Sequence, residues 1–201
     1  MKLICLDLEG VLVPEIWIAF SHATGIPELA RTTRDEPDYD KLMAFRLDLL
    51  NKNNLKLADI QRVVGGMSPL PGAAAFADSM RAKAQLVVLS DTFEQFARPL
   101  MEKLKFPTLF CNTLEVAPDG RIAGWKLRQR DGKRCAVEAF KGCNIEVFAA
   151  GDSFNDLAMI KAADSGCLFR APQAIRQMHG DIPCVDSFDE FEARIDAFLH
   201  D

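Results

Sequence analysis

The sequence has few of the features that mark membrane, nucleic-acid-binding or exported proteins. No apolar run approaches the roughly 20 residues that a membrane-spanning helix needs. The net charge of -5 and a pI near 5.3 provide no basic surface for nucleic acid or anionic lipid. Only residues 3–6 form an apolar run before Asp7, which is too short for the apolar region of a signal peptide. We therefore expect a cytoplasmic protein that binds neither nucleic acid nor membranes.

Histidines and paired cysteines are also scarce. The three histidines are scattered along the chain, so neither a histidine metal cluster nor a Ser-His-Asp arrangement is visible. None of the six cysteines forms a Cys-x-x-Cys pair, which argues against a zinc site. Cys5 and Cys167 lie in apolar runs. We expect reduced and mostly buried thiols.

The first apolar run ends abruptly in Asp7, Glu9 and Gly10. An apolar run without alternation predicts a strand buried on both faces, as in a parallel sheet beneath helices. In such sheets, ligands bind beyond the carboxyl ends of the strands. Side chains alternate along an extended backbone, so Asp7 and Glu9 share one side while Leu8 points away. Two carboxylates would converge at this edge, although the pair alone would also suit a strand that ends in a solvated loop.

Strands and helices alternate over most of the chain, with two exceptions. Residues 14–68 have helical periodicity at 15–23, 39–50 and 57–64 and no convincing strand, which predicts a small helical unit inserted after the first strand. Residues 115–117 and 122–125 flank Pro118-Asp119-Gly120, which predicts a β-hairpin. The other strands are expected at 85–89, 108–111, 146–150, 165–169 and 182–185, and the other helices at 73–83, 93–104, 131–141, 157–163, 172–178 and 188–199. This order predicts an α/β fold with a parallel sheet between helices.

Polar residues follow three of the expected buried strands. These residues are Asp7 with Glu9, then Ser90, then Asp152. Each one alone could be a turn or helix-capping residue. Together, the aspartates offer hard oxygen ligands for Mg²⁺, and Ser90 offers a hydroxyl beside the backbone N–H groups of the next helix, which can bind an anion. Lys133, in the first turn of its helix, adds a positive charge. These groups describe a phosphoryl-transfer centre.

The order of these motifs resembles that of a known enzyme family. The segment Asp7-Leu8-Glu9-Gly10-Val11, then Ser90, Lys133 and Gly151-Asp152-Ser153-Phe154-Asn155-Asp156 resemble the four motifs of haloacid dehalogenase-like phosphatases. The helical insertion is similar to the cap of the phosphoserine phosphatase branch. Glu9, the cap size and Ser90-Asp91-Thr92-Phe93 resemble a bifunctional subgroup that also transfers the phosphoryl group from phosphoserine to homoserine. The resemblance implies a Rossmann-like core over residues 1–13 and 69–201 and a cap over 14–68.

The resemblance also implies a chemical role for each acid of the centre. Asp7 would be the nucleophile that forms a phosphoaspartyl intermediate. Glu9 would protonate the leaving seryl oxygen and then activate the hydrolytic water. Mg²⁺ would be held by the Asp7 carboxylate, the Glu9 backbone carbonyl and Asp152. Asp156 would orient Lys133 or a metal-bound water.

The same resemblance assigns residues to the two ends of the substrate, phosphoserine. Glu15 would hold its amino group and Arg46 its carboxylate. The residues around the phosphate would be Ser90, Asp91, Lys133 and Asn155.

Two residues depart from the usual family pattern. Glu9 stands where the second acid of the first motif is usually aspartate, and Asp91 stands where glycine usually follows the serine. Glu9 is one methylene longer, so its carboxylate must fold back to reach the same oxygen. Both changes affect the acid-base geometry and the choice of acceptor, and our hypothesis is that they allow homoserine to replace water.

Individual residues also have simpler interpretations. Glu15 would equally suit a helix N-terminus, where the dipole favours an acid. Arg46 would suit a solvated helix face, and Asp156 would suit an N-cap. Lys126 competes with Lys133 for the basic role but lies in the hairpin, before the helix.

Three other functions remain open for the whole chain. The first is a phosphatase for another small phosphate ester, since the cap selects the substrate. The second is a signalling receiver domain, against which the helical insertion and the 152–156 motif argue. The third is a binding module that has lost catalysis, against which the presence of Asp7, Lys133 and Asp152 argues. The sequence is compatible with a monomer or a homodimer.

Overall fold

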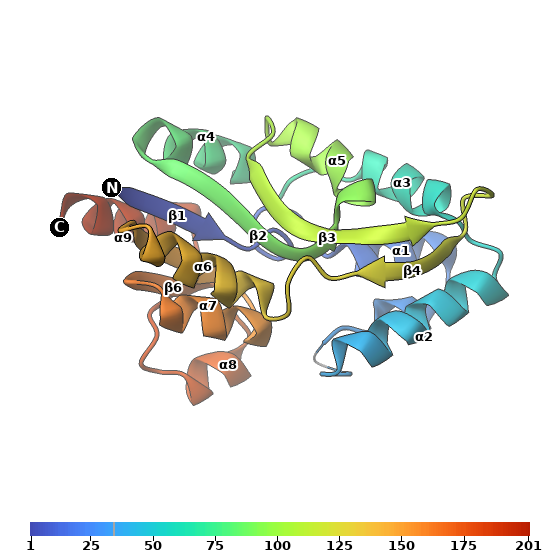
Figure 1. Cartoon of the computed structure of the whole chain (residues 1–201). Coiled ribbons are helices and arrows are strands. Elements are labelled where there is room, and N and C mark those ends of the chain that lie inside the picture. Colours follow the sequence, from blue (N-terminus) through green and yellow to red (C-terminus); the bar gives the residue numbers. More distant parts are fainter. Residues whose placement is uncertain (34) are drawn as a thin grey trace.

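One mixed sheet forms the centre of the molecule in the computed structural model, which describes residues 1–33 and 35–201. Its strand order is β4-β3-β2-β1-β5-β6-β7, and neighbouring strands are parallel except for the antiparallel pair β3 and β4 (Figure 1). The strands are β1 (Lys2–Leu6), β2 (Gln85–Phe93), β3 (Thr108–Val116), β4 (Ile122–Lys126), β5 (Glu146–Gly151), β6 (Ser165–Phe169) and β7 (Cys184–Val185). The predicted α/β fold and hairpin are confirmed.

Helices cover both faces of the sheet. One face packs against α4 (Ala73–Lys83), α5 (Glu94–Lys103) and α9 (Phe188–His200), and the other against α6 (Gly132–Gly142), α7 (Leu157–Ala162) and α8 (Gln173–Met178). The β1 side chains alternate between the two cores: Ile4 and Leu6 face the first, and Leu3 and Cys5 face the second. Both faces of β1 are buried, which explains its uninterrupted apolar sequence.

The segment after β1 is helical, as its periodicity predicts. It contains α1 (Ile16–Thr24), the short 3₁₀ helix η1 (Pro27–Ala30), α2 (Tyr39–Lys52) and α3 (Leu57–Gly66). Gly25 ends α1 with a left-handed backbone, φ 67°. Figure 1 shows the β3–β4 hairpin reaching toward α2. There the Trp125 Nε1–H donates to Asp40 Oδ1 at 3.3 Å, which links the hairpin to α2.

Three strands differ from their predicted extents, and the shortest, β7, covers Cys184–Val185 rather than 182–185. The sequence suggests separate strands at 108–111 and 115–117, but β3 is continuous because its first part pairs with β2 and its second part with β4. β2 was predicted to end before Ser90, yet it extends to Phe93, which pairs with Asn112. The β2–β3 register shifts between Leu89 and Phe93. This irregularity interrupts the ladder at Ser90, Asp91 and Thr92, the segment that reaches the site.

Two further predictions concern membranes and cysteines. Among the helices of the described part of the chain, none is both long and apolar enough to cross a membrane. All six cysteines are free thiols. Burial raises the pKa of Cys5 and Cys167 to about 12. The prediction that most cysteines are buried is wrong, because Cys111, Cys135 and Cys184 are only partly buried and Cys143 is exposed.

Candidate active site

A pocket lies beyond the carboxyl ends of β1, β2 and β5. β1 is the strand from which the order runs toward β2 on one side and toward β5 on the other, which is where α/β sheets open a crevice for ligands. The pocket brings together all the residues that the sequence nominates: Asp7, Glu9, Glu15, Arg46, Ser90, Asp91, Lys133, Asp152 and Asn155. Asp156 lies directly behind this wall and is fully buried. The local strand endings and the helical insertion therefore converge on one site.

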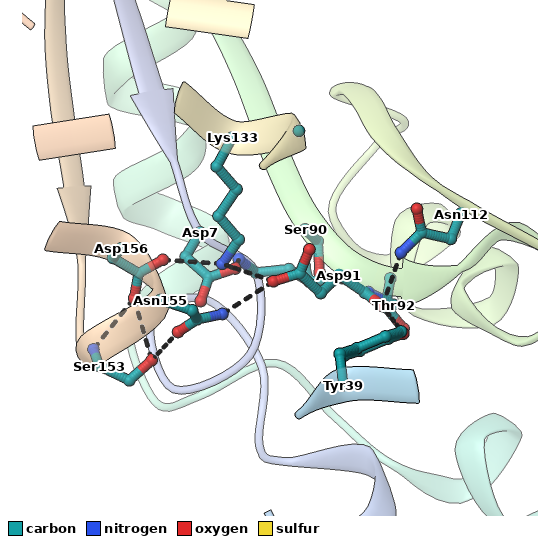
Figure 2. Close-up of polar contacts among 12 residues, drawn as sticks. Asp7, Tyr39, Ser90, Asp91, Thr92, Asn112, Lys133, Ser153, Asn155 and Asp156 are labelled. Atoms are coloured by element: carbon teal, nitrogen blue, oxygen red, sulfur yellow. Dashed lines mark hydrogen bonds and ion pairs between the residues drawn. The ribbon is translucent and has the colours of Figure 1, made fainter. Parts of the chain in front are cut away.

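The buried ammonium group of Lys133 contacts acids that follow β1 and β5. Lys133 Nζ lies 2.9 Å from Asp7 Oδ1 and 2.7 Å from Asp156 Oδ1 (Figure 2). Burial alone would lower the pKa of Lys133, but Asp156 and Asp7 raise it well above its ordinary value, so the group stays charged. Lys126, the competing candidate, lies exposed at the end of β4 and does not line this pocket.

Asp7 is held by the backbone of the neighbouring strand. Its N–H donates to the Ala150 carbonyl at 2.9 Å, and its Oδ1 accepts from the Leu8 N–H at 2.7 Å. Burial, and then the Asp156 carboxylate, raise the pKa of Asp7 well above its ordinary value, while Lys133 opposes that rise. The carboxylate form that a nucleophile needs therefore depends on positive charge at this site.

Asp156 braces the loop that carries Asp152. Its Oδ2 accepts hydrogen bonds from the backbone N–H groups of Asp152 and Ser153, each at 3.0 Å. Its side chain makes no capping bond to α7, so the simple N-cap interpretation of Asp156 is wrong for that helix. A side chain at Gly151 would collide with the Asp156 carboxylate. Because Gly151 has no side chain, the end of β5 can pack directly against the Asp156 carboxylate.

Three carboxylates converge where a cation would be expected. Asp7, Asp152 and Asp156 each offer an oxygen, and the three oxygens lie within 4.8 Å of one another. With all three acids ionised, the one positive charge of Lys133 leaves an excess of two negative charges among these four residues. Gly10 has φ 78°, and a Cβ there would lie 2.5 Å from the Asp152 Cγ. Hard oxygen donors, this charge excess and the close approach of the Gly10 backbone suit a small divalent cation.

Glu9 reaches back to the start of α1. Its Oε2 accepts a hydrogen bond from the Ile16 N–H at 2.8 Å. Burial first, and the Glu15 carboxylate second, raise the pKa of Glu9 to about 7, although the Ile16 N–H opposes the shift. A carboxyl group with this pKa can both give and accept a proton near neutral pH. The extra methylene of glutamate is thus used to reach the helix N-terminus.

Arg46 is buried, so its interpretation as a solvated helix residue is wrong. Only 6% of the residue is exposed, and its guanidinium carbon lies 4.4 Å from the centre of the Trp17 ring. One terminal nitrogen donates to the Arg31 carbonyl at 2.7 Å. Its Nε is buried and has no hydrogen-bond partner among the residues that the structure describes. Burial lowers the pKa of Arg46 to about 10, so it remains a cation at neutral pH.

Glu15 stands at the N-cap position of α1 but makes no capping bond with its side chain. Its carboxylate lines the same pocket as Arg46. The helical segment therefore contributes one acidic side chain, Glu15, and one basic side chain, Arg46, to the lining of the pocket.

The irregular end of β2 completes the site. Ser90 Oγ accepts from the Thr92 N–H at 3.2 Å, and the Asp91 Oδ2 accepts from Asn155 Nδ2 at 2.9 Å. The Asp91 carbonyl accepts from the Tyr39 hydroxyl at 2.9 Å and from Asn112 Nδ2 at 3.1 Å (Figure 2).

Sequence reasoning missed Tyr39 and Asn112. Tyr39 is the single tyrosine of the chain, a signal that could have drawn attention to it. Its partner, Asp91, is 52 residues away, and the contact depends on how α2 packs. Asn112 is a buried polar residue inside β3, and it directly follows the strand predicted at 108–111, so the sequence carried no clear signal for it.

Comparison with known proteins places this chain among haloacid dehalogenase-like hydrolases. The family model described as haloacid dehalogenase-like hydrolase matches residues 1–164. The chain is 50% identical over 192 residues to "Phosphoserine phosphatase ThrH" of Pseudomonas aeruginosa, which covers 96% of this chain and 94% of that protein. It is also 50% identical to "Phosphoserine phosphatase" of Pseudomonas syringae pv. tomato, covering 96% of this chain and 81% of the relative. A crystal structure of a phosphoserine phosphatase in apo form superposes with a TM-score of 0.76 at 21% identity, covering 95% and 96% of the two chains.

Proposed function

Because the chain belongs to the haloacid dehalogenase-like hydrolase family, we propose that it is a Mg²⁺-dependent phosphoserine phosphatase. It would transfer the phosphoryl group to Asp7 and then to water, releasing L-serine and phosphate. The observation that carries this proposal is that one pocket joins the Asp7–Lys133 pair to the Glu15 and Arg46 side chains. Two relatives with 50% identity bear the name phosphoserine phosphatase, which supports the same substrate.

We propose that residues 14–68 form a cap that selects the substrate. Residues 1–13 and 69–201 would form the core that carries out the chemistry. The helical segment supplies Glu15 from the start of α1 and Arg46 from α2. The core supplies the strand-end acids and Lys133. Charge complementarity then explains the substrate: the Glu15 carboxylate meets the ammonium group of phosphoserine. The Arg46 Nε, buried without a partner in the described structure, meets its carboxylate.

The first chemical step forms a bond between an Asp7 carboxylate oxygen and phosphorus. The bond between phosphorus and the seryl oxygen breaks, and Glu9 gives its proton to that oxygen. In the second step, Glu9 takes a proton from water while the water oxygen attacks phosphorus, and the bond to Asp7 breaks. The pKa of Glu9, about 7, suits both directions of proton transfer. Lys133 holds Asp7 in place and balances its charge.

The Asp7 and Asp152 carboxylates, with the Glu9 backbone carbonyl, would hold Mg²⁺. When bound, the ion would neutralise charge on the phosphate and on the nucleophile. Asp156 would remain a brace, because one of its oxygens pairs with Lys133 and the other accepts from the loop backbone. Ser90, Lys133 and Asn155 would hold the phosphate oxygens.

We also propose that L-homoserine can replace water in the second step. Homoserine carries the same ammonium and carboxylate groups as serine, so Glu15 and Arg46 would hold it in the same pocket. Glu9 would take the proton from its hydroxyl group as it does from water. The product would be phosphohomoserine.

Phosphate release from a panel of esters tests the proposed function. The purified protein should hydrolyse L-phosphoserine with Mg²⁺ and lose this activity in EDTA, with recovery when Mg²⁺ is restored. Added homoserine should yield phosphohomoserine. Turnover of a different ester, with phosphoserine ignored, would support the alternative of another small-ester phosphatase. Absence of turnover on every ester would favour the receiver or inactive binding module.

Replacing Arg46 should change substrate selection. We expect Arg46→Met to lower kcat/KM for phosphoserine by about 10- to 100-fold, because a charged hydrogen bond to the substrate carboxylate is lost. Phosphoethanolamine has the ammonium group but lacks that carboxylate, so its kcat/KM should change by less than about threefold. An equal loss on both substrates would contradict the assignment of Arg46 to the carboxylate.

Replacing Glu9 should lower activity and, at higher pH, raise stability. We expect Glu9→Gln to lower kcat by about 10²- to 10³-fold, because proton transfer is lost while the Ile16 contact keeps an oxygen acceptor. The pKa of Glu9 is about 7 in the folded protein, above its ordinary value of 4.5, so the folded protein keeps this proton at pH values where the unfolded chain has lost it.

The contribution of Glu9 to the free energy of unfolding therefore falls as pH rises from about 4.5 to about 7.

Urea denaturation at about pH 5 and about pH 8 checks this second expectation. The Gln variant should gain stability relative to the original protein as pH rises between these values. A constant difference at both pH values would contradict the raised pKa.

A further inference from the structure

We propose that the Asp91 carboxylate competes with phosphate for Lys133 and Asn155 and so weakens the binding of phosphate at this site. This inference rests on the proposed function, in which those two side chains hold the phosphate oxygens. Asp91 would then set the affinity for both the substrate's phosphoryl group and the released phosphate. Its role would be to speed product departure.

The competition follows from the donors that Asp91 engages. The Asn155 amide nitrogen donates to Asp91 Oδ2 at 2.9 Å, and the same oxygen lies 3.9 Å from Lys133 Nζ. Figure 2 shows the Asp91 carboxylate directed at both groups. An ammonium group has three N–H donors. Asp7 and Asp156 engage Lys133 at 2.9 and 2.7 Å, so its remaining side faces Asp91.

The backbone of Asp91 is fixed, which limits how its carboxylate can withdraw. The Tyr39 hydroxyl and the Asn112 amide both donate to the Asp91 carbonyl. Asn112 is itself buried, and its Oδ1 accepts from the Arg128 N–H at 3.0 Å. With the main chain held from two sides, the carboxylate has to move by rotation of its own side chain.

An adjoining cavity gives the Asp91 carboxylate space for this rotation. The cavity has a volume of about 410 Å³, and its lining includes Asp91, Asn155, Lys133, Gln129 and Asp131. The Asp91 side chain is 43% exposed, so it is not locked by packing. Phosphate can therefore displace the carboxylate toward this cavity, at the cost of its contacts with Asn155 and Lys133.

Charge adds to the competition for donors. Among the residues that the structure describes, five acidic side chains line the pocket, and the basic ones are Arg46 and Lys133. Of these acids, Asp91 contacts both of the proposed phosphate-binding groups, Asn155 and Lys133. The proposed mechanism gives it no part in nucleophilic attack, proton transfer or metal binding. Its negative charge opposes a phosphate dianion at short range, where like charges are costly. Removing it should strengthen phosphate binding.

Calorimetric titration with inorganic phosphate, in the presence of Mg²⁺, tests the proposal. We expect Asp91→Ala to bind phosphate about tenfold more tightly than the original protein. Asp91→Asn should also bind more tightly, but by less, because it removes the charge and keeps an oxygen that can accept from Asn155, whereas alanine removes both. The inhibition constant of phosphate against phosphoserine hydrolysis should fall by the same factor.

Asp131→Asn is the matched control. Asp131 lines the adjoining cavity and pairs with Arg134, and its backbone φ of 50° is one that asparagine tolerates. The control removes the same charge without touching Lys133 or Asn155, and its phosphate affinity should stay within about twofold.

Unchanged or weaker phosphate binding in both Asp91 variants, with melting temperatures that show they are folded, would overturn the inference. If the original protein hydrolyses phosphoserine in that case, the proposed function survives without it. If neither the original protein nor any variant binds phosphate or hydrolyses phosphoserine, the proposed function fails and this inference fails with it. An equal gain in Asp131→Asn would also overturn it, because the effect would then come from net charge.

Discussion

Asp7→Asn should abolish phosphoserine turnover, with a loss of about 10⁴-fold or more, because the amide cannot attack phosphorus. The change keeps the size of the side chain and an oxygen that can accept from the Leu8 N–H. It also removes one of the carboxylates that crowd Lys133, while Asp156 remains as its ion-pair partner. We therefore expect the variant to fold and lose activity.

Initial rates of phosphate release from the purified variant measure this loss. Intact mass and peptide mapping must exclude deamidation, which would restore the aspartate in a fraction of the molecules. Asp131→Asn, the same substitution at an exposed acid, should keep its activity within about twofold. Mg²⁺-dependent turnover that persists in fully amidated Asp7→Asn would disprove the nucleophile assignment.

Lys133→Met should lower both stability and activity. The ammonium lies between Asp7 and Asp156, and these residues are no more than 5% exposed. Its removal leaves buried carboxylates without their counter-charge, so we expect the free energy of unfolding to fall by about 3–5 kcal/mol. Catalysis should fall as well, because Asp7 loses its positioning contact and the phosphate loses a cation.

Urea denaturation measures the stability of this variant. Lys126→Met is the control, since Lys126 is exposed at the end of β4, and its stability should change by less than about 0.5 kcal/mol. The double variant Asp7→Asn with Lys133→Met should regain part of the lost stability, because one uncompensated charge is gone. Equal destabilisation in the single and double variants would show that lost packing, rather than charge, causes the effect.

Much of the fold could be predicted because local patterns determine it. β1 is apolar throughout since both its faces are covered, and that pattern is visible without any structure. The acids that follow β1 and β5 had to meet, because neighbouring parallel strands end at the same edge. Asp7 and Asp152 could therefore be placed together from sequence alone.

Other features depend on contacts that no local pattern encodes. The end of β2 lies in an irregular ladder set by its pairing with β3, so a break was expected where the strand continues to Phe93. Arg46 was nominated for the site, but the sequence also allowed a solvated helix face, and only the packing of α2 onto Trp17 of α1 shows that it is buried. The contacts of Asp91 with Tyr39 and Asn155 join segments 52 and 64 residues away. These contacts require the helical segment and the core to be in place together.

The cap boundaries and the chemical roles were implied by the family resemblance, and they remain predictions. The pocket places each nominated side chain within one site, but their roles depend on the reaction itself. In the proposed function, the substrate assignment depends on Arg46 and Glu15, and the chemistry depends on Asp7.

The most direct test of the account is the mass of the protein quenched with acid during turnover of phosphoserine. With Mg²⁺ present, we predict a fraction of molecules that carry one phosphoryl group, located by peptide mapping at Asp7 and absent from Asp7→Asn. Added homoserine should shorten the lifetime of this species and yield phosphohomoserine. A phosphoryl group on another residue, or rapid turnover with no phosphorylated protein at any quench time in the millisecond range, would contradict transfer through Asp7.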